Sequence, residues 1–564
     1  MPNQRFLLIS DTTLTHDYRN FPLLNFLPAA PVNMLPRPIY SFLRGSAPPV
    51  LPDGQTRLAP YSIRKIEGAL LKGFSEREVA VPHEDYLERF ITRETEVIAI
   101  STMDPLGLAP LTMSYAALFN SIDYTAWVRM EFEELVSRIN KARVRAKSKA
   151  KLLIGGPGVW EFTVMPDELD RLGIDYAFQG EVDDIACGLF EDVANGSPGS
   201  SQDTGLFRGF QTFDSSFHKS LVEHEKFLTR TRSSKQTPTL EEIPDIRKPS
   251  MSSLVEIMRG CGVGCDFCEV TLRPLRYYPY EKVQREVEVN VRQGGFTNAW
   301  LHADEIFAYQ HGRNFEPNVD ALTGLFRAVM SVKGVEWTNP THGRVSIPAA
   351  CPDLIRQLST IMRAGPSNWI GIQVGIETGS ERLARMHMPN KTLPLRIGAD
   401  GSWSDIVWQG VYVMNKYYWR PAFTLQVGQT GEEPEDNWET VALINRLSNS
   451  ELDNGRPFEF TITPMQNVPL GMINNKEFKL NTLDKSQLAV YYASYRHLAR
   501  MAARNAVIES SGNTLTRYLT AALISFGGRL MLAAVSAICR KRGLDLGKVA
   551  RYGLTDKKVT ALNL

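Results

Sequence analysis

The sequence predicts an α/β protein in three parts: a doubly wound N-terminal domain, a partial (β/α) barrel and a helical C-terminal domain. Two observations support this fold class. Short apolar runs alternate with amphipathic helical stretches through the first 475 residues, which is typical of parallel sheets covered by helices. The pattern then becomes helical to the end of the chain. We expect domains at 1–195, 250–475 and 476–564, with a connector over 196–249.

The composition is that of an ordinary soluble globular protein. Of 564 residues, 43% are hydrophobic and 22% charged, and the formal net charge is +1. A nearly neutral chain has no general attraction for nucleic acid, so we expect no nucleic-acid partner. Six cysteines are too few for a disulfide framework, and the N-terminus lacks the pattern of a signal peptide. We therefore expect a cytoplasmic protein.

The N-terminal domain is predicted from apolar runs that read as buried parallel strands. The strand ends carry small polar residues and glycines, and glycine after a strand lets backbone N–H groups approach a phosphate or nucleotide closely. For GGPG at 155–158, a plain tight turn is the alternative. The predicted strands are 5–11, 77–82, 96–102, 151–158 and 175–181, and the intervening helices include 62–74 and 132–150.

The barrel is predicted from a second series of strands separated by helices. In such barrels the functional groups gather at the carboxyl ends of the strands. A cysteine-rich loop follows the first of these strands, and acidic residues follow the second and fourth. The predicted strands are 254–260, 298–307, 335–342, 370–380, 422–431 and 458–464, and the helices include 280–296, 319–331, 353–362 and 437–449.

The stretch GCGVGCDFCE at 260–269 holds Cys261, Cys265 and Cys268 in the spacing C-x3-C-x2-C. A zinc site usually has four ligands, and the other three cysteines are distant in sequence. Three thiolates bound to three irons of a cubane leave one iron open for a further ligand. The pattern therefore favours an iron–sulfur cluster. The alternatives are a loop that holds three cysteines by chance and a zinc site completed by a distant histidine.

Residues 250–475 resemble the barrel of radical S-adenosylmethionine (radical SAM) enzymes. HADEIF (302–307), GIETGS (375–380) and QVGQTGEEPED (426–436) carry the resemblance after the cysteine motif. It implies that the three cysteines hold a 4Fe-4S cluster whose open iron binds S-adenosyl-L-methionine. It further implies contacts to that molecule from Ala303, Asp304, Glu305, Glu377, Ser380 and Gly428.

The N-terminal domain resembles the cobalamin-binding domain of one branch of that superfamily. The resemblance rests on strands ending in IST and GGPG, followed by DYAFQGE. The D-x-H-x-x-G motif that supplies a histidine to cobalt is absent, and His16 lacks this pattern. Arg64 is a candidate for the lower face of the cofactor, with a surface or phosphate-binding arginine as the alternative. The implied cobalamin contacts are Ser101, Thr102, Gly155, Gly156, Gly180, Glu181 and Arg64.

Together the two resemblances imply a cobalamin-dependent radical SAM methyltransferase that acts on an unactivated carbon. The domain order is similar to that of the archaeal enzyme that methylates a glutamine of methyl-coenzyme M reductase. We therefore expect methylcobalamin as a cofactor, a protein or peptide substrate and an external electron donor. The alternatives are polar methyl transfer of the tryptophan type, a cyclisation or rearrangement, and a cobalamin-binding sensor that keeps the barrel for structure.

The C-terminal part is predicted as helices at 485–510 and 516–538, without a recognisable catalytic motif. We interpret it as a cover for the substrate entrance. The stretch LTAALISFGGRLMLAAVSAI (519–538) is about long enough to cross a bilayer. Arg529 and the pair Gly527–Gly528 interrupt it, and an arginine at the bilayer centre is costly. We therefore expect a buried helix, with a membrane span as the alternative, and no stable membrane insertion.

Overall fold

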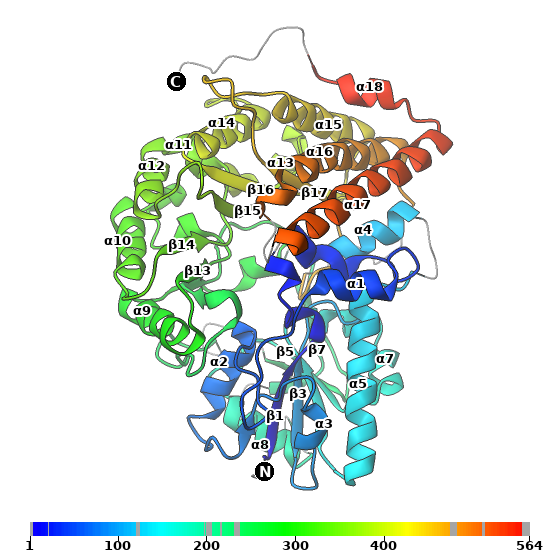
Figure 1. Ribbon diagram of the computed structural model, residues 1–564, viewed down its shortest axis with the longest axis vertical. Coiled ribbons are helices and arrows are strands. Elements are labelled where there is room, and N and C mark those ends of the chain that lie inside the picture. The colour runs from blue at the N-terminus through cyan, green and yellow to red at the C-terminus, as the bar shows by residue number, and fades with distance from the viewer. Residues whose placement is uncertain are drawn as a thin grey trace.

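The computed structural model describes residues 4–20, 22–119, 124–196, 198, 206–214, 217–230, 237–473, 482–509 and 514–554. Figure 1 shows the N-terminal domain in blue and cyan below the barrel in green and yellow, with the C-terminal helices in orange and red along one side. The fold class is thus the predicted α/β arrangement with helices at the C-terminal end.

The N-terminal domain is built on a seven-stranded sheet of order β2-β1-β3-β4-β5-β9-β6. All five predicted strands are present, and each pairs in parallel with its neighbour. The strands are β1 (Phe6–Ser10), β2 (Val79–Ala80), β3 (Val97–Ser101), β4 (Lys151–Gly155), β5 (Tyr176–Gln179), β6 (Leu206–Arg208) and β9 (Phe227–Arg230).

The predicted connector differs from the structure, because part of it belongs to this sheet. Strand β9 pairs in parallel with β5, and β6 pairs antiparallel with β9, so the sheet continues to Arg230. A hairpin of β7 (Phe210–Phe213) and β8 (Lys219–Val222) lies between them in sequence. Strand β9 contributes two fully buried apolar side chains, Phe227 and Leu228, and the fully buried Thr229. Residues 197 and 199–205, near the start of the predicted connector, lie outside the described residues.

Both faces of this sheet are covered, and β1 shows why. Successive side chains of a strand point to opposite faces. Leu7 and Ile9 join the core on the side of α5 (Trp127–Ala146), and Phe6 and Leu8 join the core that includes α2 (Tyr61–Leu70) and α8 (Ala186–Ala194). A run of apolar residues without alternation is therefore what a doubly covered parallel strand requires.

The barrel consists of two three-stranded parallel sheets with helices outside them (Figure 1). A parallel bridge between His342 and Gln373 links the two sheets, which gives the predicted partial barrel. The first sheet holds β10 (Leu254–Glu256), β13 (Asn298–His302) and β14 (Trp337–Pro340), and the second holds β15 (Ile370–Glu377), β16 (Trp419–Val427) and β17 (Thr461–Gln466). The outer helices include α9 (Tyr280–Val289), α10 (Val319–Met330), α12 (Pro352–Ile361), α14 (Trp403–Lys416) and α15 (Pro434–Ser448).

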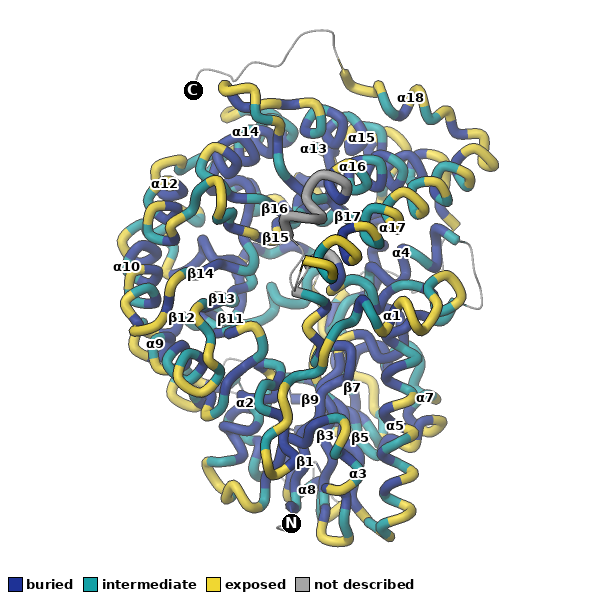
Figure 2. The backbone as a smooth tube through the Cα atoms, in the orientation of Figure 1, coloured by how far each residue is buried: buried dark blue, intermediate teal, exposed yellow. Residues whose placement is uncertain are grey.

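The C-terminal part forms α16 (Lys485–Glu509), α17 (Thr514–Lys541) and α18 (Leu546–Arg551). The expectation of a buried helix at 519–538 is wrong. Only 11% of the most apolar stretch of α17 is buried, and Figure 2 shows exposed residues along its length. The helix continues through Gly527–Gly528, and only a narrow face of it packs on the protein. By length and composition, α17 could cross a membrane.

Candidate functional site

The three clustered cysteines lie on a loop that a short antiparallel pair closes. Strand β11 (Met258–Arg259) pairs with β12 (Arg276–Tyr277), and the cysteines lie between them. Gly260, Gly262 and Gly264 all adopt positive φ, at 75°, 69° and 82°. A Cβ on Gly260 would lie 2.4 Å from the carbonyl oxygen of Arg273, so the loop needs glycine there.

The thiols of this loop lie close enough to influence one another. Cys261 and Cys265 are buried, and Cys268 is half-buried. Burial raises the pKa of Cys265 to about 12 and that of Cys268 to about 11, and burial and the charge of Cys268 raise the pKa of Cys261 further. The irons of a cluster would stabilise the thiolate form of such thiols. Among the described residues, no three His, Cys, Asp or Glu side chains form a group that would hold a single metal ion.

The acidic residues after β13 have different environments. Asp304 is half-buried, and its negative charge raises the pKa of both Cys261 and Cys268, so it lies beside the thiols. Glu305 is buried, accepts a hydrogen bond from the backbone N–H of Phe307 at 3.1 Å and lies 3.3 Å from Arg344. Asp304 is therefore the acid of this pair that faces the cysteine loop.

Glu377 ends β15 in a left-handed backbone conformation, with φ of 60°. Its carboxylate pairs with Lys391 Nζ at 2.8 Å. Burial would lower the pKa of Lys391, but the charge of Glu377, with the hydrogen bond to it, contributes to raising it. Sequence reasoning did not identify Lys391, since it lies outside the matched motifs.

Ser380 and Gly428 lie at the same barrel edge but have partners within the protein. The Ser380 hydroxyl donates to Asp436 at 2.6 Å, and the backbone N–H of Gly428 donates to Glu432 at 2.7 Å. Ala303 is fully buried at the end of β13. The structure thus brings the predicted residues of the barrel to one edge, and their contacts to a ligand stay a prediction.

A histidine that sequence reasoning missed joins two of these segments. The ring of His387 lies with Nδ1 2.8 Å from Asp266, inside the cysteine loop, and Nε2 2.8 Å from the carbonyl oxygen of Thr430, in the turn after β16. A carboxylate and a carbonyl both accept hydrogen bonds, so the geometry suits a ring that carries both protons. Burial would lower the pKa of His387, but the hydrogen bond and charge of Asp266 and the hydrogen bond to Thr430 together raise it.

The predicted residues of the N-terminal domain gather at the carboxyl edge of its sheet. Gly156 has φ of 90°, and a Cβ there would lie 2.7 Å from the Thr102 carbonyl oxygen and 2.9 Å from Ser101 Oγ. The backbone N–H of Thr102 donates to Gly155 at 2.9 Å. A Cβ on Gly155 would meet only one atom, at 3.8 Å, so the space beside this residue is open. Gly180, with φ of 131°, lies after the next strand.

Most of the donors of Arg64 are bound within the protein. The side chain is fully buried, and it donates to the carbonyl oxygens of Pro249 at 3.0 Å and Arg57 at 3.1 Å and to Glu67 at 2.7 Å. Its neighbour Lys65 pairs with Glu286 of α9. The contact of Arg64 with Pro249 attaches α2 to the segment that enters the barrel, and the place of Arg64 below cobalt stays a prediction.

The segment after β1 is rich in buried polar groups. His16 Nδ1 lies 3.1 Å from the Thr12 carbonyl oxygen, and its Nε2 lies 3.4 Å from Glu84. Burial lowers the pKa of His16 and raises the pKa of Asp11 to about 7. Within the described part of the chain, four buried atoms here have no hydrogen-bond partner: Ser10 Oγ, Asp11 Oδ2, Arg44 Nε and Glu84 Oε2. A polar ligand at the end of β1 would satisfy such atoms.

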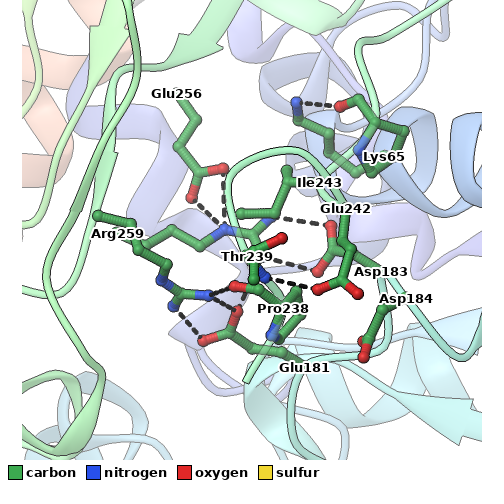
Figure 3. Close-up of polar contacts among 12 residues, drawn as sticks. Lys65, Glu181, Asp183, Asp184, Pro238, Thr239, Glu242, Ile243, Glu256 and Arg259 are labelled. Atoms are coloured by element: carbon green, nitrogen blue, oxygen red, sulfur yellow. Dashed lines mark hydrogen bonds and ion pairs between the residues drawn. The ribbon is translucent and has the colours of Figure 1, made fainter. Parts of the chain in front are cut away.

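Glu181 connects the two carboxyl edges. Its carboxylate lies 2.9 Å from Arg259 and 2.7 Å from Arg276, and Asp183 and Glu256 also pair with Arg259 at 2.6 and 3.0 Å (Figure 3). Burial alone would raise the pKa of Glu181, but the hydrogen bond from Arg276 and the charge of Arg259 lower it to about 2.

The positions of these residues in the chain show which two segments the network joins. Glu181 directly follows Gly180 at the N-terminal edge, and Arg259 is two residues before Cys261 at the barrel edge. The network therefore holds the end of β5 against the start of the cysteine loop. A role for Glu181 in binding cobalamin stays a prediction, since the observed partners of its carboxylate are arginines.

No family model matches the chain. It is 26% identical over 166 residues to the tRNA-2-methylthio-N(6)-dimethylallyladenosine synthase of Chlorobaculum tepidum, a match that covers 28% of this chain and 37% of that protein. The chain thus spans little more than a third of the length of this curated relative.

Solved structures similar to this one include those of OxsB and TsrM. OxsB, a cobalamin-dependent S-adenosylmethionine radical enzyme with aqua-cobalamin and S-adenosylmethionine bound, matches with a TM-score of 0.50 and 10% identity, over 94% of this chain and 72% of that one. TsrM from Kitasatospora setae, a radical S-adenosylmethionine methyltransferase with tryptophan substrate bound, matches with a TM-score of 0.45 and 15% identity, over 78% of this chain and 70% of that one. The likeness to OxsB shows that the two chains share a fold.

Proposed function

We propose that this protein is a cobalamin-dependent radical SAM methyltransferase that acts on an unactivated carbon. One observation carries the proposal: the edge that holds the cysteine triad is joined, through Glu181 and Arg259, to the edge that holds the glycines expected around cobalamin. Two cofactors must reach one substrate carbon, and adjoining carboxyl edges provide that arrangement.

At the barrel edge, Cys261, Cys265 and Cys268 would hold a 4Fe-4S cluster. The donor set fits, because three neighbouring thiols on a glycine-rich loop, two of them buried and one half-buried, leave one iron of a cubane open. Asp304 would accept hydrogen bonds from the amino group of S-adenosylmethionine. Lys391 and the buried Arg344, whose Nη2 atom has no hydrogen-bond partner among the described residues, would bind its carboxylate.

At the N-terminal edge, the open space beside Gly155 and the unpartnered polar atoms after β1 fit a large polar cofactor such as cobalamin. When bound, the cluster, S-adenosylmethionine and cobalamin supply hydrogen abstraction and methyl transfer. His16 has protein partners at both ring nitrogens, which favours cobalamin without a histidine ligand. The protein itself positions the groups and excludes water.

For the substrate, we propose a carbon of an amino-acid residue within a protein or peptide, with electrons from an external donor. The substrate has to enter between the two edges. The helices α16 and α17, which flank the N-terminal part and the barrel in Figure 1, would border that entrance. An open entrance of this kind suits an extended peptide better than a closed pocket would.

The cluster is tested by metal content. Anaerobically reconstituted protein should hold about four irons per chain. The triple change Cys261→Ala, Cys265→Ala and Cys268→Ala should remove them, whereas Cys351→Ala, a half-buried cysteine elsewhere in the barrel, should keep them. Retention of iron and sulfide by the triple variant would overturn the cluster assignment.

The reaction is tested with isotope-labelled S-adenosylmethionine, cobalamin and candidate peptides under anaerobic conditions. Methyl transfer with hydrogen abstraction should yield 5′-deoxyadenosine and S-adenosylhomocysteine in equal amounts with methylated product. S-adenosylhomocysteine without 5′-deoxyadenosine would favour the polar mechanism, and 5′-deoxyadenosine with an unmethylated, rearranged product would refute methyl transfer. Label appearing in tRNA would contradict the substrate class.

A further inference from the structure

Helix α17 presents an apolar stripe to solvent. Its exposed large side chains are Leu515 (78% exposed), Tyr518 (59%), Leu519 (46%), Phe526 (65%) and Leu530 (58%). Alanines at 522, 533 and 537 are also exposed. Successive members of this set are mostly three or four residues apart, so they lie on one side of the helix. Scattered exposed apolar residues are ordinary, but a contiguous stripe of this size marks an interaction surface.

The opposite side of α17 attaches the helix to the protein. Val535 and Cys539 are fully buried, and Leu523 and Ile524 pack against a small cluster near the N-terminus. Gly528 lies against α16, since a Cβ there would be in van der Waals contact with Ala502, at 3.7 Å. The helix therefore lies along the surface of the molecule, as Figure 1 shows, and does not project from it.

The charges of α17 have a single sign. Residues 514–541 contain no aspartate or glutamate. Arg529 lies next to Leu530 within the stripe, and Arg540 and Lys541 continue its spacing beyond residue 537. In the part of the chain that the structure describes, these three cations form no ion pair with an acidic residue. The exposed side of the helix is thus both apolar and cationic.

We propose that α17 docks this protein onto an anionic lipid bilayer, with the helix axis parallel to the membrane plane. Apolar side chains of such helices enter the bilayer by about 5–10 Å, while cations contact the headgroups. Each cation near an anionic surface strengthens binding roughly fivefold. A second copy of this chain fits the surface less well, because the α17 face offers no acidic group to its own cations.

The same features argue against a helix that crosses the bilayer. Crossing would require α17 to leave α16, which would expose Val535 and Cys539 and their buried partners. It would also place Arg529 near the bilayer centre. In the plane of the membrane, Arg529 can extend its charged end to the headgroups while its methylenes stay beside Leu530.

The test is sedimentation of the full-length protein with vesicles of phosphatidylcholine alone or mixed with phosphatidylglycerol. Wild-type protein should bind the anionic vesicles at least roughly tenfold more tightly, and high salt should remove that preference. The double change Phe526→Ser and Leu530→Ser should weaken binding to anionic vesicles roughly tenfold or more. Arg540→Gln with Lys541→Gln should remove most of the preference for anionic lipid.

Val144→Ser is the matched control, because Val144 is 80% exposed on α5, far from α17 in sequence. It should bind vesicles as the wild type does. The proposal fails if neither vesicle binds, or if Val144→Ser loses binding equally. It also fails if light scattering shows a dimer in solution that only the Phe526/Leu530 variant dissociates. Because these assays need neither cofactor nor turnover, their outcome is independent of the proposed methyl transfer.

Discussion

The two carboxyl edges of this molecule hold their candidate ligand groups by opposite means. At the N-terminal edge the contacts are made by backbone: Gly156 passes within contact distance of Thr102, and Gly155 leaves space. At the barrel edge they are made by charged side chains, such as Glu377 with Lys391. The stability of the edge formed by backbone contacts should fall when a side chain adds volume there. The stability of the edge formed by charged side chains should change with pH and when a charge is removed.

The largest effect should come from the network between the edges. Glu181→Gln leaves Arg259 and Arg276 with one acceptor fewer in a buried setting, so unfolding should become easier by about 4 kcal/mol. Urea unfolding of the two proteins would measure this. Glu381→Gln is the matched control, because its partner Arg385 is 53% exposed, and it should cost less than about 1 kcal/mol. Equal losses of unfolding free energy in the two variants would show that the buried network adds no more stability than an exposed ion pair.

The same network should weaken in acid. The pKa of Glu181 is about 2 in the folded protein and 4.5 ordinarily, so its contribution is complete above pH 4.5 and is lost as pH falls toward 2. A shift of this size corresponds to about 3 kcal/mol. The difference in unfolding free energy between wild type and Glu181→Gln should therefore narrow below pH 4.5. A difference that stays constant with pH would refute the assignment.

The next effect should come from adding one methyl group to the N-terminal edge. Gly156 has φ of 90° and ψ of 179°, a region open only to glycine, and a Cβ would meet backbone atoms at 2.7 Å. Gly156→Ala should cost about 2–3 kcal/mol in thermal unfolding. Gly155→Ala, at the open neighbour, should leave stability unchanged but weaken cobalamin binding in an absorbance titration. Equal stability of the two variants would remove the distinction between these glycines.

The smallest effect should come from His387. Its pKa is raised in the folded protein, so its contribution is complete below about pH 6.5 and is lost as pH rises through the raised value. Hydrogen exchange in residues 428–432, corrected for the intrinsic pH dependence, should therefore quicken with rising pH. His387→Gln should make exchange roughly fivefold faster at pH 6 and remove the pH dependence, at a cost of about 1 kcal/mol. If His387→Gln left the pH dependence of exchange unchanged, the His387 ring would not be its source.

Residues adjacent in sequence were the predictable ones. Strands such as β1 and β3 are continuous apolar runs, and Cys261, Cys265 and Cys268 lie within one loop, so local pattern was sufficient. Strand β9 was missed because it is only four residues long and carries the polar Thr229 and Arg230 in a polar surrounding.

Contacts between distant segments could not be predicted in the same way. Glu181 and Arg276 are 95 residues apart, and His387 and Asp266 are 121 apart, so no local pattern relates them. The only local indication of the His387 contact was Asp266, an acidic residue between Cys265 and Cys268. The exposure of α17 was predicted wrongly because composition shows only how apolar a helix is. Whether other segments cover that helix depends on the tertiary structure.

The attachment of α2 also determines when, during translation, the N-terminal domain can complete its contacts. The buried Arg64 and Lys65 find their partners at Pro249, Pro244 and Glu286, and β5 gains its outer neighbour only with β9. At about 5–20 residues per second, roughly 10–45 s separate translation of Lys65 from that of Glu286. Until β9 is made, the nascent N-terminal sheet has an unpaired edge, and until Glu286 is made, Lys65 lacks its carboxylate partner, whereas Arg64 already has Glu67. A ribosome-bound chaperone would have its longest opportunity to act on this protein before the barrel begins to form.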